Sequence, residues 1–410
     1  MNDKNRGDDM VHNSSFTTHN SFVPRLRFPE FREAGEWTSA FVKDLISTVT
    51  PPKKLTSNLY EEEGSFPVID QSQSYICGWT NDEDALVSVR SPLIVFGDHT
   101  CVLKIVDQPF VQGADGIKII KAKSAVDPTF LYQYLLFNPV SMESYKRHFS
   151  TLKEKLVVYP KKATGEQQKI ADCLSSLDTL IAAQADKLDA LKTHKKGLMQ
   201  QLFPREGETV PRLRFPEFRE AGEWEIKKAK FLFSNRVEHG EDGLPVYSVT
   251  MNVGLAKRDS LARKIDDISF SSGNKKVYKH DIAYNMMRMW QGASGVAVED
   301  CMVSPAYVIL EPSDGVCAEL YGYFLKLPQS LQALTAHSQG LTKDRLRLYY
   351  KDFAQIPLPK PPLGEQQKIA ACLSSLDTLI AAQTDKLDAL KSHKKGLMQQ
   401  LFPSPKAMAA

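Results

Sequence analysis

Residues 165–204 read GEQQKIADCLSSLDTLIAAQADKLDALKTHKKGLMQQLFP, and residues 364–403 repeat that string with three substitutions in forty positions. A second repeat opens each half: VPRLRFPEFREAGEW stands at 23–37 and again, unchanged, at 210–224. The intervening stretches, 38–164 and 225–363, do not resemble each other. Repetition at this scale indicates two copies of one architecture. A chain that keeps its frame constant while the sequence between differs is suited to presenting two different surfaces.

The repeated forty-residue string has the pattern of an amphipathic helix with a heptad seam. Its apolar residues recur at alternating steps of four and three, which is typical of a and d positions. Polar residues interrupt the seam at Gln184 and Lys195, and at Gln383 and Lys394 in the second copy. The predicted seam residues are Ile170, Leu174, Leu177, Ile181, Leu188, Leu191, Leu198, Leu202, Ile369, Leu373, Leu376, Ile380, Leu387, Leu390, Leu397 and Leu401.

A helix of this length, roughly 58 Å at 1.5 Å per residue, needs a partner for its apolar stripe. The favoured partner is its own copy, because two matching seams in one chain sit at high effective concentration. A pseudo-twofold relation would then make the two helices antiparallel and place one variable domain near each end. The alternative is a parallel coiled coil between two chains.

Both variable segments have the pattern of mixed α/β domains. The first has strand-like runs at 85–90, 93–97, 101–106, 116–122 and 156–160, with a helix expected over 128–149. The second has comparable runs at 244–250, 281–287, 294–299, 306–312 and 353–359, with a helix near 317–336. The shared order predicts two divergent copies of one domain.

The predicted fold class is therefore α+β, with two mixed α/β domains joined by two long antiparallel helices. The expected divisions are a disordered lead at 1–22, a first domain at 23–164, a first helix at 165–204, a second domain at 210–363, a second helix at 364–403 and a tail at 404–410.

Composition indicates an ordinary globular protein. No apolar run approaches the roughly 20 residues needed to cross a bilayer, and the N-terminus has no hydrophobic signal segment, so we expect a cytoplasmic protein without membrane contact. None of the six cysteines forms a Cys-x-x-Cys pair, which predicts reduced thiols and no metal site. The net charge of +3 neither requires nor excludes a nucleic-acid surface.

Cationic, aromatic and amide side chains gather where loops are expected in both variable segments. Arginine and lysine can reach guanine edges or phosphates, and glutamine can pair with adenine, so these residues are candidates for DNA contact. Each one taken singly is more often an ordinary solvated residue. The candidates are Lys53, Lys54, Tyr75, Trp79, Arg90, His99, Lys104, Lys257, Arg258, Lys275, Lys276, Arg288, Trp290 and Gln291. The nearby Met286, Met287 and Met289 are expected in the core.

No catalytic machinery is recognisable in the sequence. It contains no Gly-x-x-x-x-Gly-Lys-Ser/Thr phosphate loop, and the Gly292–Gly295 run misplaces the glycine that a nucleophile elbow requires. Asn138-Pro139-Val140 departs from the Asn-Pro-Pro-aromatic motif of adenine methylation. We therefore expect a non-catalytic chain with no catalytic residues and no bound metal.

The chain resembles the specificity subunits of type I restriction–modification systems over essentially residues 23–403. The resemblance rests on GEQQKIA at 165–171 and 364–370, KKGLMQQLFP at 195–204 and 394–403, and RLRFPEF at 25–31 and 212–218. Within the variable segments, VFGDHT at 95–100 and MWQGASG at 289–295 are similar to segments of that family.

The resemblance implies two target recognition domains that each read one half of a split, asymmetric site in double-stranded DNA. It also implies two methyltransferase subunits docked on the helices and, in the full complex, two motor/endonuclease subunits. S-adenosylmethionine, ATP and magnesium would belong to those partners, and this chain would bind no cofactor. The alternatives are a stand-alone bipartite DNA-binding protein, an unrecognised nuclease and a plain coiled-coil tether.

Overall fold

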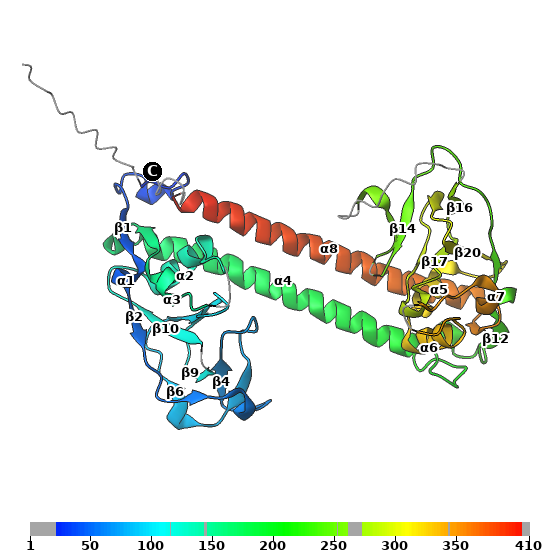
Figure 1. The fold of residues 1–410 in the computed structure, drawn as a ribbon, viewed down its shortest axis with the longest axis horizontal. Helices are drawn as coiled ribbons and strands as arrows, with labels where there is room; N and C mark the ends of the chain where they lie inside the picture. The colour runs from blue at the N-terminus through cyan, green and yellow to red at the C-terminus, as the bar shows by residue number, and fades with distance from the viewer. Residues whose placement is uncertain are drawn as a thin grey trace, which may run out of the picture. The chain divides into compact units, whose positions relative to one another are not determined.

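The computed structural model describes residues 22–403 except 115, 143–145, 252, 261–272 and 343–344. The chain divides into two compact units, and each contains one variable domain (Figure 1). Unit 1 comprises residues up to Gln184 together with residues from Lys386 onward, and unit 2 comprises Ala185–Asp385. Each unit therefore contains the start of the long helix that follows its domain and the end of the other long helix.

The two long helices are α4, Glu166–Leu202, and α8, Leu363–Leu401. Within unit 1, Gln400 accepts the Leu26 N–H beside the start of α4, whereas Lys394 pairs with Asp178 further along. The α8 segment in unit 1 is therefore antiparallel to the α4 segment. Unit 2 repeats this arrangement, since Gln201 accepts the Leu213 N–H and Lys195 pairs with Asp377. Both ion pairs join segments of one chain, as the intramolecular pairing predicted.

The same four-stranded antiparallel sheet stands at the centre of both variable domains. In unit 1 its order is β2 (Ile46–Val49), β10 (Ile117–Ala122), β7 (Leu93–Gly97) and β8 (Leu103–Val106). In unit 2 its order is β13 (Phe233–Asn235), β20 (Tyr307–Pro312), β17 (Ile282–Asn285) and β18 (Ser294–Val296). Matching strand order supports the prediction of two divergent copies of one domain.

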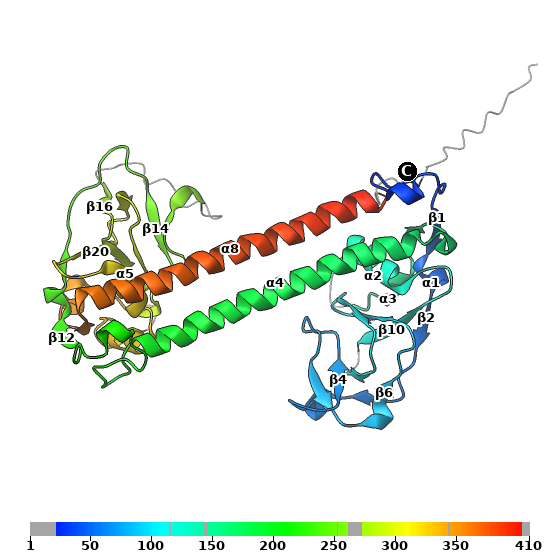
Figure 2. The same cartoon turned by 180° about the vertical axis from the view of Figure 1, so that it is seen from behind.

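The central strand β7 of unit 1 reads as a continuous apolar run because both of its faces are covered. Alternate residues of a strand point to opposite faces, so Ile94 and Phe96 of β7 enter the core shared with the long helices. Leu93 and Val95 enter a second core under the other sheet of unit 1. In both views the four-stranded sheet of unit 1 lies between α4 and that other sheet (Figures 1 and 2).

Smaller sheets complete each unit. Unit 1 has a ribbon of β1 (Thr38–Phe41) with β11 (Leu156–Tyr159), and a five-stranded sheet of β3 (Lys54–Leu55), β9 (Phe110–Gly113), β4 (Phe66–Ile69), β5 (Gly78–Thr80) and β6 (Leu86–Val87). Unit 2 has ribbons of β12 (Glu225–Lys228) with β21 (Pro357–Lys360), β14 (Tyr247–Thr250) with β15 (Gly254–Lys257), and β16 (Lys275–Val277) with β19 (Cys301–Val303).

Short helices replace the longer ones predicted in the variable domains. Unit 1 has α1 (Val42–Leu45), α2 (Pro128–Phe137) and α3 (Phe149–Lys153), and unit 2 has α5 (Ala318–Phe324), α6 (Pro328–Ala336) and α7 (Tyr350–Phe353). The helices predicted over 128–149 and 317–336 were wrong in extent. Proline disfavours helical backbone in the residue before it and lacks an N–H, so Pro139 and Pro328 interrupt the two runs.

Candidate nucleic-acid interface

A buried arginine–glutamate pair locks each variable domain to its long helix. In unit 2 the Arg214 guanidinium donates two hydrogen bonds of 2.7 Å to Glu365, and both side chains are under 10% exposed. In unit 1 Arg27 donates the same two bonds to Glu166, also at 2.7 Å. Hydrogen bonds to these carboxylates raise the pKa of both guanidinium groups. The repeated arginine and glutamate of the frame are therefore structural.

The residue after each of these glutamates is a buried glutamine, which fixes the start of a helix in the domain that precedes it in the chain. Gln167 accepts the Asp127 N–H at 2.6 Å and donates to the Pro160 carbonyl oxygen at 2.7 Å. Gln366 accepts the Cys317 N–H at 2.8 Å and donates to the Pro361 carbonyl oxygen at 2.8 Å. Since Asp127 and Cys317 precede α2 and α5, each domain is held in the same way on its long helix.

All sixteen predicted seam residues are buried or partly buried. Those near the helix ends enter the domain cores: Ile170, Leu174 and Leu401 lie in the main core of unit 1, and Ile369, Leu373 and Leu202 in that of unit 2. The helix ends are thus anchored in the domains as well as facing each other. Direct pairing along the middle of the seam stays a prediction.

The four-stranded sheets of the two units carry different hairpin tips at equivalent places. The β17–β18 hairpin closes with a bond from the Asn285 N–H to the Ala293 carbonyl oxygen, and the β7–β8 hairpin closes in the same way between Gly97 and Val102. A residue from later in the chain then donates a backbone hydrogen bond to each tip. The Leu348 N–H donates to the Met286 carbonyl oxygen, and the His148 N–H donates to the Asp98 carbonyl oxygen. Between these points unit 2 carries seven residues, 286–292, and unit 1 carries four, 98–101.

The longer tip of unit 2 brings three of the predicted residues together. Met287, Arg288, Trp290 and Gln291 line a hollow of about 280 Å³. The Trp290 indole donates to the Met287 carbonyl oxygen at 3.1 Å, and Gly292 ends the turn with a φ of +86°. Of the three methionines expected in the core, Met289 is buried, but Met287 is 44% exposed, so the core prediction was wrong for Met287.

The shorter tip of unit 1 is held more tightly to its own domain. Asp98 is buried and accepts the Phe149 N–H at 2.8 Å, and the Thr100 hydroxyl donates to the Gln71 carbonyl oxygen at 2.8 Å. His99 is partly buried at this tip. Of the predicted residues in unit 1, His99 alone occupies the position equivalent to the Arg288 loop.

The other candidates in unit 1 lie elsewhere on the domain. Lys53 is exposed and pairs with Asp82, Lys54 is exposed on β3, Trp79 is partly buried in β5, and Arg90 is exposed. The Tyr75 hydroxyl donates to the Ile105 carbonyl oxygen at 2.7 Å. Lys104 is 4% exposed and donates to the Asp70 and Ser74 carbonyl oxygens, and burial lowers the pKa of its ammonium. The structure therefore gives Lys104 a structural role in place of the predicted DNA contact.

The remaining candidates in unit 2 are engaged by neighbouring protein groups. Lys257 pairs with Glu299 at 2.8 Å, and Arg258 donates to the Ser248 hydroxyl at 3.4 Å. Lys275 is partly buried, donates to the Tyr307 carbonyl oxygen at 2.8 Å, and has a pKa lowered by burial. The hydrogen bond of Lys275 to backbone, like those of Lys104, gives this side chain a structural role.

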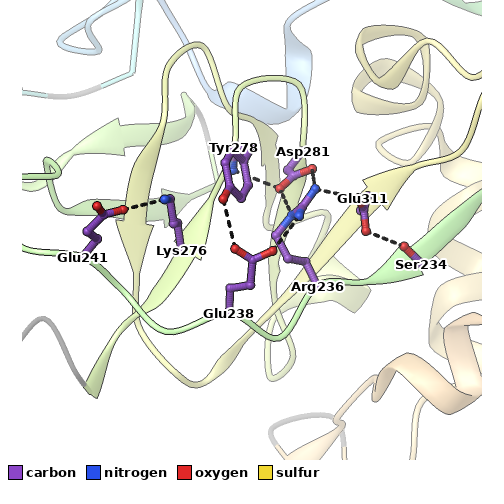
Figure 3. A network of polar contacts seen from close by, with 8 residues as sticks. All are labelled: Ser234, Arg236, Glu238, Glu241, Lys276, Tyr278, Asp281 and Glu311. Atoms are coloured by element: carbon purple, nitrogen blue, oxygen red, sulfur yellow. Dashed lines mark hydrogen bonds and ion pairs between the residues drawn. The ribbon is translucent and has the colours of Figure 1, made fainter.

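Lys276 belongs to a polar network around Arg236. Figure 3 shows Lys276 directed to Glu241, while the Arg236 guanidinium lies among Asp281, Glu238 and Glu311. Asp281 is 2% exposed, and burial raises the pKa of its carboxyl group although Arg236 opposes that shift. The Arg236 guanidinium also stacks on Tyr278, 4.5 Å from the ring centroid. This network holds the end of β16 and the start of β17 in place.

Sequence reasoning missed a neighbour of the β17–β18 tip, the β14–β15 turn. That turn exposes Met251 by 40% and Val253 by 74%. A Cβ built on Gly295 of β18 would lie 2.2 Å from the Leu255 nitrogen, so the two hairpins are in direct contact. The signal in the sequence was Gly254, whose φ of +80° marks a tight turn.

Lys326, two residues after α5, packs against Gly254 and Gly292 and was not predicted. Its Cγ lies 3.8 Å from the position of a Cβ on Gly292. Burial, and to a smaller extent the charge of Lys195, lower the pKa of the Lys326 ammonium. Among the described residues, no group of three or more His, Cys, Asp or Glu side chains could hold a metal ion, and no helix is long and apolar enough to cross a membrane.

Comparison with known proteins places both units in one family. The model of the type I restriction modification DNA specificity domain matches residues 34–193 and again 224–392. The specificity subunit of the type I restriction enzyme MjaVIII from Methanocaldococcus jannaschii is 29% identical over 149 residues, which cover 35% of this chain and 33% of that protein.

Two longer alignments agree with this match. The specificity subunit of the type I restriction enzymes EcoR124I/EcoR124II from Escherichia coli is 22% identical over 366 residues, covering 80% of this chain and 83% of that protein. A crystal structure of the S subunit of a type I restriction–modification system from M. genitalium has the same fold, with a TM-score of 0.62 at 16% identity, covering 93% of this chain and 99% of that one.

Proposed function

Since the chain belongs to the family of type I restriction–modification DNA specificity proteins, we propose that it is the sequence-recognition subunit of such a complex, in which each unit reads one half of a bipartite DNA site. The chain itself would catalyse no reaction. Its role would be to choose the site and to hold partner enzymes in register with it.

The observation that carries this proposal is that both domains are attached to a long helix in the same way but have different hairpin tips. Both domains have the same strand order and the same arginine–glutamate and glutamine contacts to a long helix. Their hairpin tips differ in length and in chemistry, with Arg288, Trp290 and Gln291 in unit 2 and His99 and Thr100 in unit 1. Because sequence is read through side chains that reach base edges, different tips should read different half-sites. The full site should then be asymmetric.

The long helices would set the distance between the half-sites. At about 1.5 Å per residue, the 37 residues of α4 extend roughly 55 Å. Modules that read one face of B-DNA contact half-sites about one helical turn, or 34–36 Å, apart. A continuous helix can supply a fixed separation of this order, which a flexible linker cannot.

The partners would be two copies of an adenine methyltransferase subunit, joined in the full complex by two motor/endonuclease subunits. Apolar residues of the repeated sequence are exposed to similar extents in both copies: Leu180 by 46% and Leu379 by 40%, and Val23 by 45% and Val210 by 41%. Exposed apolar side chains that occur at equivalent positions in both copies suit two copies of one partner. The methyl donor, ATP and magnesium would bind those partners, and the target adenine would be flipped into the methyltransferase.

Co-expression with a methyltransferase subunit from the same system, followed by mapping of N6-methyladenine in host DNA, tests the function. We expect one gapped, asymmetric motif that disappears when this chain is deleted. Tight DNA binding by the isolated chain without any methylated motif would instead favour a stand-alone bipartite DNA-binding protein. Magnesium-dependent cleavage by the isolated chain would reveal a nuclease.

A further inference from the structure

The β17–β18 tip of unit 2 carries polar groups that the fold does not use. Arg288 and Gln291 are exposed, and neither side chain forms a hydrogen bond or ion pair with any residue that the structure describes. The other predicted cations of unit 2 are occupied, as Lys257 is by Glu299 and Lys276 by Glu241. A free guanidinium and a free amide at one tip are therefore open to a ligand.

Hydrogen bonds within the tip also fold its backbone into an ordered loop. The Trp290 indole is tied to the Met287 carbonyl oxygen, and the backbone N–H groups of Gln291 and Gly292 donate to Arg288 and Met289 carbonyl oxygens. These bonds fix the backbone of the loop from which Arg288 and Gln291 line the hollow of about 280 Å³. A loop whose backbone is already ordered loses little backbone entropy when a ligand binds to the side chains that it carries.

We propose that this hollow is the purine-reading site of unit 2, in which the Arg288 guanidinium donates its two-pronged fork to a guanine edge in the major groove. This proposal rests on the proposed function. Arginine is suited to guanine because O6 and N7 both accept hydrogen bonds at the spacing of the fork. Gln291 lies beside it and can pair with the neighbouring base.

The surroundings of the tip favour a base edge over a phosphate. A phosphate contact requires only a cation, whereas this tip adds an amide, an indole and the 44% exposed Met287. The adjacent β14–β15 turn contributes exposed Met251 and Val253, which are suited to thymine methyl groups.

The β7–β8 tip of unit 1, whose four residues are all described, has no counterpart of this site. This tip places buried Asp98 where unit 2 has Met286, and it carries no arginine, glutamine or tryptophan. The guanine contact should therefore affect only one half of the bipartite site, which gives the proposal a position-specific test.

The test compares Arg288→Ala, Arg288→Lys and wild type, each co-expressed with the methyltransferase subunit, by mapping methylated sites. We expect a single guanine in one half of the motif to become degenerate in both variants, while the other half stays unchanged. In competition binding with duplexes altered at that base pair, discrimination should fall about 10- to 100-fold, the range of one bidentate contact. The salt dependence should change little in Arg288→Lys, which keeps the charge.

Lys279→Ala is the matched control, because Lys279 is an exposed cation near the opposite end of β17. It should leave every position of the motif unchanged. The proposal is overturned if the Arg288 variants keep full discrimination at all positions, or if they weaken all duplexes equally, which is the behaviour of a phosphate contact. If the wild-type complex methylates no gapped motif, the proposed function fails first, irrespective of any Arg288 variant.

Discussion

At the scale of single residues, buried charge decides how each domain is held. Arg214 and Glu365 are 151 positions apart in sequence, yet they form a bidentate pair under 10% exposed. Removing one member of such a pair leaves the other charge buried without compensation, which costs much more than the pair itself contributes. The two frame pairs are therefore the positions at which single substitutions should be most damaging.

We expect Glu365→Gln to destabilise unit 2 by about 3–5 kcal/mol, because Arg214 would lose its countercharge. Calorimetric unfolding of the full chain would show the lower transition temperature. Glu217→Gln is the control, since Glu217 pairs with Lys368 at the surface, where both side chains are about half exposed. An equal loss in the two variants would contradict a special role for the buried pair.

Lys326 offers a second residue-scale prediction, with a defined pH dependence. Burial lowers its pKa in the folded protein below that of the unfolded chain, so folding disfavours its charged form. Lys195 and Asp377 are the charged groups that act on it, and Lys195 adds to the lowering. The penalty is fully present below the folded pKa and vanishes as pH rises above the unfolded value near 10.5.

Lys326→Met should therefore raise the unfolding temperature at pH 7, and the gain should shrink as pH approaches 10.5. Thermal scans at pH 7, 9 and 10 would measure it. A gain that does not change with pH would show that side-chain packing, and not the lysine charge, is responsible.

At the scale of elements, each long helix contains a glycine at the same position, which lowers the stability of the helix. Gly197 and Gly396 occupy equivalent helical positions, and a Cβ added at either would meet open space. Glycine within a helix costs about 1 kcal/mol relative to alanine. The same cost occurs in both copies, and no close contact among the described residues requires a glycine at either position.

The double variant Gly197→Ala, Gly396→Ala should accordingly be more stable than wild type, by about 1 kcal/mol per site. Urea unfolding of the chain would measure this. Gly295→Ala provides the contrast, because its Cβ would clash with the Leu255 nitrogen and should destabilise unit 2. A loss of stability in the double variant would contradict the open surroundings of the two helical glycines.

Leu180 and Leu379, exposed at equivalent positions of α4 and α8, test the docking of methyltransferase subunits. We expect Leu180→Glu or Leu379→Glu alone to reduce the bound subunits from two to one, and the double variant to bind none. Native mass spectrometry counts the copies. Lys121→Glu, an exposed change on β10, should retain both. Two bound copies in the double variant would place the docking surface elsewhere.

At the scale of the whole molecule, the helices are proposed to act as a ruler. Removal of one heptad from the middle of both α4 and α8 shortens each by about 10.5 Å while keeping the seam pattern, which corresponds to about three base pairs. We expect the gap in the methylated motif to shorten by that amount, or methylation to be lost. An unchanged gap in active, methylating complexes would rule out the ruler.

The sequence alone determined the large divisions of this protein because they depend on local periodicity and on repetition. The heptad pattern predicted two helices within a few residues of their observed ends, and the matching runs predicted two copies of one domain. Candidate contacts were harder to predict from sequence. Lys104 and Arg288 are both cations near strand ends, and only tertiary packing buries the first and leaves the second open.

The tertiary structure alone decided which distant residues meet. The pairs between Arg27 and Glu166 and between Arg214 and Glu365 span more than a hundred residues, and local periodicity carries no information at that separation. The equivalence of a four-residue and a seven-residue tip was likewise hidden, because their sequences share no motif. Backbone pairing within one sheet order brings them to the same place, and hydrogen-bond register is a property of the folded chain.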